Sequence, residues 1–495
     1  MGLAIDRADF TPQDHARFAA KLRDGLRALR VLLATPGFGH GPATVGAELE
    51  LSLVDACGRP SPVNLPVLRD SLDERLTCEL DRFNVECNLR YGSLAGRPFH
   101  ALADEMQDAL AEVARAARPH GARVAVIGTL PTLRAADLEA GAMTDTPRFR
   151  ALSRALQERR RAPFRLCIDG AEPLDTHCDD VTAEGANTSL QVHLRVAPDR
   201  FAALYDAAQI ATVAAVAASG NSPIFLGHRL WQETRVALFK QAVDARDADA
   251  RRSGDPARVS FGSGWLRDGA YELFAEAVER FEALLPVCSD EDPLALLASG
   301  EVPQLGEIRL HQGTVWRWNR PVYDPAGGGH LRIEMRALPA GPTVADMAAN
   351  TAFLVGVTLG LAPAIDAWRR GWPFEALHRS FYRAAKHGLA AKLDWPLQPG
   401  ARPCTRPAPD VVRALLPVAA HGLAQAGVDA DERHRLLGIV AERVASGTTG
   451  AVWQERTLES LEARSGREGA LSEMLLRYMQ LSHAGEPVHR WPLDV

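Results

Sequence analysis

The chain has 495 residues, 46% of them hydrophobic, and a formal net charge of −6. This length and apolar content predict a globular protein with a large core and more than one structural layer. The acidic balance, without a long basic run or a basic stripe interleaved with aromatics, argues against nucleic acid as a partner and for small molecules.

Targeting and disulfide signals are lacking in this sequence. The first residues mix acids and bases without an apolar stretch, which argues against a secretory signal peptide. The longest apolar run, residues 352–365, is interrupted by glycines and Thr358 and is too short to span a bilayer. Seven scattered cysteines without CxxC spacing argue against a disulfide framework and a zinc ribbon. We therefore expect a cytoplasmic protein without a membrane partner, and the sequence leaves its oligomeric state open.

The first predicted elements are a helix and an acidic strand. Residues 14–34 predict an amphipathic helix, because leucines recur at three- and four-residue steps before a Gly- and Pro-rich breaker. Residues 45–55, VGAELELSLVD, alternate as a strand does, with Glu48 and Glu50 on one face. At a rise of about 3.3 Å per residue their side chains stand about 7 Å apart. Alone, the pair is either a solvated face or half of a metal site.

Two further segments in the first half repeat the alternation. Residues 76–90, LTCELDRFNVECNLR, place Asn84, Glu86 and Asn88 on one face. Residues 188–196, TSLQVHLRV, place Ser189, Gln191, His193 and Arg195 on one face. Between them we predict a helix at 102–117 and a buried strand at 122–132, whereas residues 131–185 show little beyond a helix-like 151–160.

The second half is richer in helices. We predict helices at 200–218, 229–245 and 269–286, and a charged surface loop at 240–264. Residues 306–339 predict two or three strands around the turn DPAGGG, and the last, LRIEMRAL, places Arg332, Glu334 and Arg336 on one face. Helical patterns dominate after Thr343. The Pro-rich residues 395–409 interrupt them, and we interpret this as the boundary between a catalytic domain, 1–395, and a C-terminal helical subdomain, 396–495.

The four predicted strands thus share one pattern. Each has an apolar face and a polar face, and none of the polar faces contains Lys. The free face of an antiparallel sheet is usually a mixed solvated surface. Carboxylates instead supply oxygen ligands to Mg²⁺, and arginines match phosphate oxygens in pairs. Singly, His193 could be a structural histidine and Arg332 with Glu334 a surface ion pair. Jointly, the strands favour a metal–phosphate site, and no P-loop or Rossmann motif competes with it.

Five segments of the sequence, taken in their order along the chain, resemble those of a known family. VGAELEL, FNVECNL, SLQVHL, GNSPIFLG and RIEMRALPAGPT, between residues 45 and 362, resemble the glutamate–cysteine ligases of the plant and bacterial type and related carboxylate–amine ligases. The resemblance implies the glutamine synthetase-like fold: an α+β fold with a curved antiparallel sheet, helices on its apolar face and a C-terminal helical region. It also implies that the concave face binds ATP and two or three Mg²⁺ ions.

The resemblance also implies roles for single residues. Glu48 and Glu50 would bind different Mg²⁺ ions, and the remaining metal ligands would be Glu79, Glu86 and Glu334. Arg336, in the family's E-x-R pattern, would contact the transferring phosphoryl group with Arg332 assisting, and Arg235 would bind a substrate carboxylate. Some relatives have a metal-binding His where this chain has Gln191. Whether Gln191 or His193 touches metal or nucleotide is therefore left open.

The implied activity is the ATP-dependent joining of the γ-carboxylate of glutamate to the amine of cysteine, through an acyl phosphate, as in glutathione biosynthesis. One alternative keeps the fold and chemistry but uses another amine or carboxylate. A second is a metal-dependent hydrolase, which needs clustered acids but neither Arg332 nor Arg336. A third is a binding protein without catalysis, which is disfavoured because no acid of the set is missing.

Overall fold

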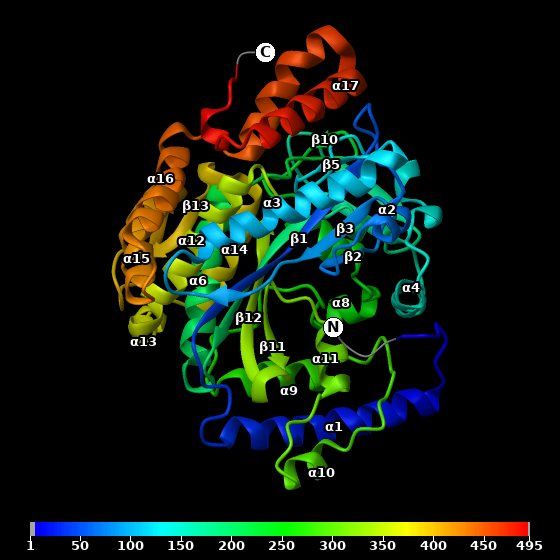
Figure 1. The fold of residues 1–495 in the computed structure, drawn as a ribbon, viewed down its shortest axis with the longest axis vertical. Coiled ribbons are helices and arrows are strands. Elements are labelled where there is room, and N and C mark those ends of the chain that lie inside the picture. Colours follow the sequence, from blue (N-terminus) through cyan, green and yellow to red (C-terminus); the bar gives the residue numbers. More distant parts are fainter. Residues whose placement is uncertain (1–4, 494–495) are drawn as a thin grey trace.

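The computed structural model describes residues 5–493, and its centre is an eight-stranded antiparallel sheet (Figure 1). Six strands lie in the order β11-β12-β8-β1-β3-β2, and β4 and β5 both pair with β1. The bounds of the strands are β1 Thr44–Val54, β2 Leu76–Cys78, β3 Asn84–Asn88, β4 Gly92–Ser93, β5 Arg123–Ala125, β8 Ser189–Val196, β11 Asn319–Asp324 and β12 His330–Pro339. The predicted fold class is confirmed.

Strand register brings the four predicted polar faces together. Glu48 lies between Asn88 of β3 and Gln191 of β8, and Glu50 lies opposite Glu86. His193 of β8 lies opposite Glu334 of β12. The other face of β1 is apolar, with Ala47, Leu49, Leu51 and Leu53 at most 3% exposed. A period of two therefore divides the sheet into a core face and a polar face.

Three helices cover the apolar face of the sheet: α3 (Pro98–Ala117), α6 (Phe201–Ser219) and α12 (Val344–Leu361). Helices α6 and α12 are mostly apolar and have nearly all of their residues buried, as expected of core helices. Both belong to stretches that are long and apolar enough to cross a membrane. These stretches are Pro198–Ser219 and Val344–Arg369, and in the most apolar 18-residue window of each, 89% and 78% of the window is buried within the protein, as in core helices.

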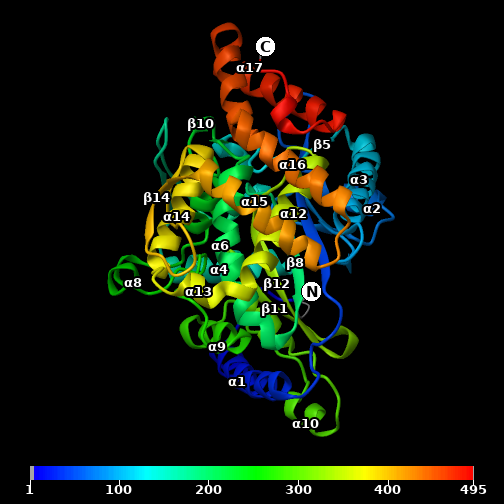
Figure 2. The same ribbon diagram turned by 90° about the vertical axis from the view of Figure 1, so that its left-hand side faces the viewer.

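The C-terminal helices pack against this core. Helices α15 (Ala408–Gln425) and α16 (Ala430–Ser446) lie on α12, and α17 (Gly450–Ala484) lies at one end of the molecule (Figure 2). The Pro-rich segment forms a two-stranded hairpin of β13 (Lys392–Pro396) and β14 (Pro403–Pro407). The division into domains at residues 395 and 396 stays a prediction.

Most other predicted elements are present with changed lengths. Residues 306–312, predicted within a strand region, form α11 instead, because alternation over seven residues does not distinguish a strand from a helix buried on most sides. The predicted strand at 122–132 shortens to β5, and α8 lies within the predicted surface loop. The remaining elements longer than three residues are α1 Pro12–Ala34, α2 Asn64–Asp70, α4 Pro147–Arg160, β6 Phe164–Ile168, β7 Leu174–Cys178, α5 Thr182–Gly185, α7 Arg235–Ala242, α8 Ala248–Ser253, α9 Ala270–Arg280, α10 Pro293–Ala298, α11 Gly306–Gln312, α13 Ile365–Arg369 and α14 Phe374–His387, together with the 3₁₀ turn Ala135–Leu138.

Candidate active site

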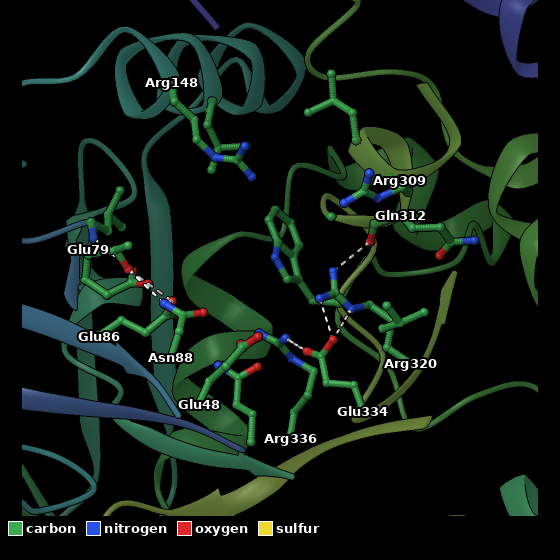
Figure 3. Close-up of a pocket in the computed structure, with 18 of the residues that line it drawn as sticks. Glu48, Glu79, Glu86, Asn88, Arg148, Arg309, Gln312, Arg320, Glu334 and Arg336 are labelled. Carbon is green, nitrogen blue, oxygen red and sulfur yellow. Dashed lines mark hydrogen bonds and ion pairs between the residues drawn. The ribbon is translucent and has the colours of Figure 1, made fainter. Parts of the chain in front are cut away.

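A cavity of about 770 Å³ lies over the polar face of the sheet (Figure 3). Its floor carries the acids of β1, β3 and β12, and its walls come from α4, α5, α11 and β11. Nine of the ten site residues predicted from the sequence line this cavity: Glu48, Glu50, Glu79, Glu86, Gln191, His193, Arg332, Glu334 and Arg336. The tenth, Arg235, does not.

One group of carboxylates combines three acids on neighbouring parts of the sheet. Oxygens of Glu50, Glu79 and Glu86 lie within 4.8 Å of one another, close enough for one cation to bind all three. Burial, and then the charges of Glu48 and Glu50, raises the pKa of Glu86 to about 7. Burial and the charge of Glu86 likewise raise the pKa of Glu79. Such mutual repulsion is what a divalent cation would relieve.

Glu50 is held in place by β8. One oxygen accepts hydrogen bonds from the backbone N–H of Ser189 at 2.8 Å and from its hydroxyl at 2.9 Å. The other oxygen accepts from Nε2 of Gln191 at 2.6 Å. Gln191 therefore orients a candidate metal ligand through its side-chain amide.

A second group combines Glu48, His193 and Glu334, whose ligand atoms also lie within 4.8 Å of one another. Nε2 of His193 is 3.1 Å from a Glu48 oxygen. Burial would raise the pKa of Glu48, but the charge of His193 and its hydrogen bond outweigh burial and lower it. Glu48 and Glu50 thus fall in different groups, the arrangement expected for two ions. His193 is the member of the Gln191–His193 pair that shares a candidate metal site.

Glu334 lies at the centre of an ion-pair network. Its Oε2 accepts hydrogen bonds from Nε of Arg320 at 2.9 Å and from Nη2 of Arg320 at 2.5 Å, and its Oε1 accepts from Arg336. Burial would raise the pKa of Glu334, but Arg320, Arg336 and His193 outweigh burial and lower it well below its ordinary value. Glu334 therefore stays ionised and orients two guanidinium groups.

Arginines face the acids across the cavity. Figure 3 shows Arg148 reaching in from α4, and Arg309 with Gln312 from α11. Arg332 lines the cavity beside Asp324, with 3.3 Å between Nη2 and Oδ2. Among the described residues, Arg148 makes no hydrogen bond or ion pair with another side chain, and burial lowers its pKa. The arrangement places metal ligands and phosphate- or carboxylate-binding groups in one cavity.

Arg235 lies behind the cavity wall, which corrects the expectation that it contacts substrate. Its side chain is 2% exposed, its Nε donates to Glu233 at 2.7 Å, and its Nη2 donates to the carbonyl of Ala337 at 2.8 Å. These donors are directed into the protein. The sequence places Arg235 near the site but does not reveal which way its side chain points.

The residues that line the cavity but were not predicted as site residues include Glu184, Arg148, Arg309, Gln312 and Arg320. A signal existed for Arg320, because counting back from the turn DPAGGG pairs it with Glu334, and the two are register partners. Arg309 and Gln312 are three residues apart in α11, so a helix prediction for this segment, in place of the strand prediction made there, would have placed them on one face. Glu184, whose pKa burial raises to about 8, and Arg148 lie where the sequence has no clear pattern.

Comparisons with known proteins agree with this geometry. Metal-ligand groups facing arginines on a curved antiparallel sheet suit an enzyme that activates a carboxylate with ATP for attack by an amine. The family model of glutamate-cysteine ligase family 2 matches residues 44–474, and the chain belongs to this family. It is an ATP-dependent carboxylate–amine ligase.

One solved structure has a similar fold at low sequence identity. A glutamate–cysteine ligase from Francisella tularensis in complex with AMP is 10% identical, with a TM-score of 0.52 over 92% of this chain and 91% of that chain. A bifunctional glutathione synthetase from Pasteurella multocida is 12% identical, with a TM-score of 0.47 over 93% of this chain and 55% of that one. A search of curated proteins found no match.

Proposed function

We propose that this enzyme joins the γ-carboxylate of glutamate to the amine of cysteine, using ATP and Mg²⁺, through an acyl phosphate in the cytoplasm. One observation carries the proposal. Two groups of metal-binding side chains share one cavity with five arginines, Arg148, Arg309, Arg320, Arg332 and Arg336. A hydrolase needs the acids but has no evident need for so many guanidinium groups.

The donor sets suit Mg²⁺. Carboxylate oxygens are the ligands this ion prefers, and it commonly keeps positions for water and substrate phosphates. Glu50, Glu79 and Glu86 would hold one ion, and Glu48, Glu334 and His193 would hold another. Bound there, Mg²⁺ would neutralise phosphate charge and orient the phosphates for transfer.

In the first step, an oxygen of the substrate γ-carboxylate attacks the γ-phosphorus of ATP, and the bond to the β,γ-bridging oxygen breaks to release ADP. Arg336 would donate to the oxygens of the transferring phosphoryl group, where charge is greatest. Glu334 fixes Arg336, and Arg320 neutralises the remaining charge of Glu334. Arg332, beside Asp324, would assist from the same face of β12.

In the second step, the amine nitrogen attacks the acyl carbon and forms the amide bond. The bond between that carbon and the phosphate oxygen breaks, phosphate leaves with the electron pair, and the nitrogen loses a proton to water or phosphate. Arg148 and Arg309 would bind carboxylate groups of the substrates, because both reach the cavity from the wall opposite the metal ligands. This cationic wall favours amines that carry a carboxylate, and the alternative is a different amino acid in place of cysteine.

The direct test incubates purified protein with MgATP, glutamate and a panel of amino acids that includes cysteine, and follows ADP, phosphate and product mass. We expect ADP and γ-glutamylcysteine in equal amounts, and no turnover with EDTA. Turnover with another amine but not with cysteine would select the alternative. Phosphate release without ATP consumption would contradict a ligase.

A further inference from the structure

The strand that carries Arg336 contains a bulge at that residue. Met335 pairs with Val192 and Leu338 pairs with Leu190, so Arg336 and Ala337 together lie opposite one residue of β8, Gln191. A bulge leaves part of the ladder unpaired and re-aims the side chains next to it. The residue proposed to contact the phosphoryl group therefore depends on the shape of an irregular backbone segment.

Two hydrogen bonds fix this bulge from opposite sides. The backbone N–H of Arg336 donates to the carbonyl of Trp318 at 2.9 Å. Ala337 has no register partner in β8, and its carbonyl accepts from Nη2 of Arg235 at 2.8 Å. A buried carbonyl needs such a partner, because leaving it unpaired costs free energy. Arg235 thus bonds the backbone of β12 at a bulge residue that has no register partner in β8.

The guanidinium of Arg235 is itself fixed by Glu233. The Glu233 side chain has no exposed surface, and its Oε1 accepts from Nε of Arg235 at 2.7 Å. The same carboxylate accepts from the Ser222 hydroxyl and from the Asn221 backbone N–H. A planar guanidinium can bond a carboxylate and a carbonyl at once in a fixed geometry, whereas an ammonium group cannot reproduce that fork.

We propose that Arg235 is a positioning residue, which holds the Ala337 carbonyl through the Glu233-anchored guanidinium and thereby aims Arg336 into the cavity. Arg235 does not touch substrate in this account. The inference rests on the proposed function, in which Arg336 contacts the transferring phosphoryl group. It also explains why a buried arginine lies directly behind the catalytic face of β12.

The test compares Arg235→Lys with Arg443→Lys. Arg443 is a matched control, because it is 1% exposed, pairs with Asp346 at 2.6 Å and does not line the cavity. We expect Arg235→Lys to lower kcat by about 100-fold, the effect of misplacing a catalytic group by about 1 Å, while KM for ATP stays near its wild-type value. Arg443→Lys should lower the melting temperature but leave kcat per folded molecule unchanged. If Arg235→Lys does not fold, the double variant Glu233→Gln with Arg235→Gln replaces it, because that variant leaves no unpaired charge of this buried pair.

Two further measurements separate positioning from general destabilisation. In protein that already carries Arg336→Lys, adding Arg235→Lys should lower kcat only slightly further, because Arg235 acts through residue 336. Hydrogen exchange at the backbone amides of residues 335–338 should rise in Arg235→Lys and not in Arg443→Lys, and this readout needs no turnover. Additive losses of kcat, or unchanged exchange at the bulge, would overturn the proposal. Absence of ligase turnover in the wild type, with increased exchange at the bulge in Arg235→Lys, would overturn the proposed function alone.

Discussion

At the scale of single residues, the site is a balance of buried charges. Glu334 and Glu48 have lowered pKa values because cationic neighbours outweigh burial, whereas burial and then the charges of neighbouring acids raise the pKa values of Glu79 and Glu86. Glu334 is thus ready to orient Arg320 and Arg336, with which it pairs. Glu79 and Glu86 repel each other, and a bound cation would relieve that repulsion.

Glu86→Gln should separate stability from metal binding. Removing one of three mutually repelling carboxylates should raise the melting temperature without cations by about 2 °C, roughly 1 kcal/mol. It should also weaken stabilisation by Mg²⁺, because one oxygen ligand of the group is lost. The measurement is thermal unfolding with EDTA and with MgCl₂. As a control, Glu172→Gln removes a partly buried acid paired with Arg229 and Arg467, so it should keep the full Mg²⁺ effect. An undiminished Mg²⁺ effect in Glu86→Gln would contradict the site.

The pH dependence of stability should have a definite sign. The pKa of Glu86 is raised from 4.5 to about 7, so the folded state holds this proton more tightly than the unfolded state. Without cations, the contribution of Glu86 to stability is therefore present at low pH and is lost as pH rises through about 7. Mg²⁺ replaces the proton, so its stabilising effect should be larger at about pH 8 than at about pH 5. Melting temperatures at both pH values, with and without MgCl₂, check this. A larger Mg²⁺ effect at the lower pH would disagree with it.

At the scale of elements, alternation in four segments was enough to predict the polar face of the sheet. Each strand has only one apolar face to bury, so alternation showed which residues share the polar face, whereas the pairing of residues between strands came from the structure. Alternation failed at α11, where seven residues buried on most sides fit either period. Alternation also did not predict that α4 and α5 lie over the cavity, because their position depends on packing between distant segments of the chain. Arg148 and Glu184 were therefore found only in the structure, whereas Arg320 could have been found from its strand pairing.

Helix α4 supplies a residue whose loss should affect binding and not folding. Arg148 makes no hydrogen bond or ion pair with other described side chains, so Arg148→Ala should change stability by less than about 0.5 kcal/mol. Its guanidinium reaches the cavity, so KM for an anionic substrate should rise about tenfold, the loss of one charge-assisted hydrogen bond. Separate KM values for ATP, glutamate and the amine identify the partner. Arg150→Ala, on the exposed side of α4, is the control. Unchanged KM values for all three substrates would show that Arg148 binds none of them.

At the scale of the whole molecule, the C-terminal helices are joined to the core by buried polar contacts. Arg443 of α16 pairs with Asp346 of α12, and both side chains are at most 1% exposed. The Tyr478 hydroxyl of α17 donates to the carbonyl of Val126 at 2.9 Å. The sequence predicted where the chain becomes mainly helical. It did not predict how much of the hydrophobic core the last hundred residues contribute.

A fragment of residues 1–395 tests the predicted domain boundary. We expect it to unfold without a cooperative transition or to aggregate, because it exposes the apolar face of α12 and leaves Asp346 buried without Arg443. Circular dichroism during heating and size-exclusion chromatography provide the measurement, with the full chain as the reference. A monomeric fragment with a cooperative transition would support independent domains.

The central claim is that a substrate carboxylate is phosphorylated in this cavity before the amine attacks. Glutamate labelled with ¹⁸O in its γ-carboxylate tests it most directly, with MgATP, cysteine and mass analysis of the phosphate released. The account predicts one ¹⁸O atom in each phosphate, because the oxygen that attacks phosphorus leaves with it. Phosphate without ¹⁸O, formed together with γ-glutamylcysteine, would contradict the acyl phosphate.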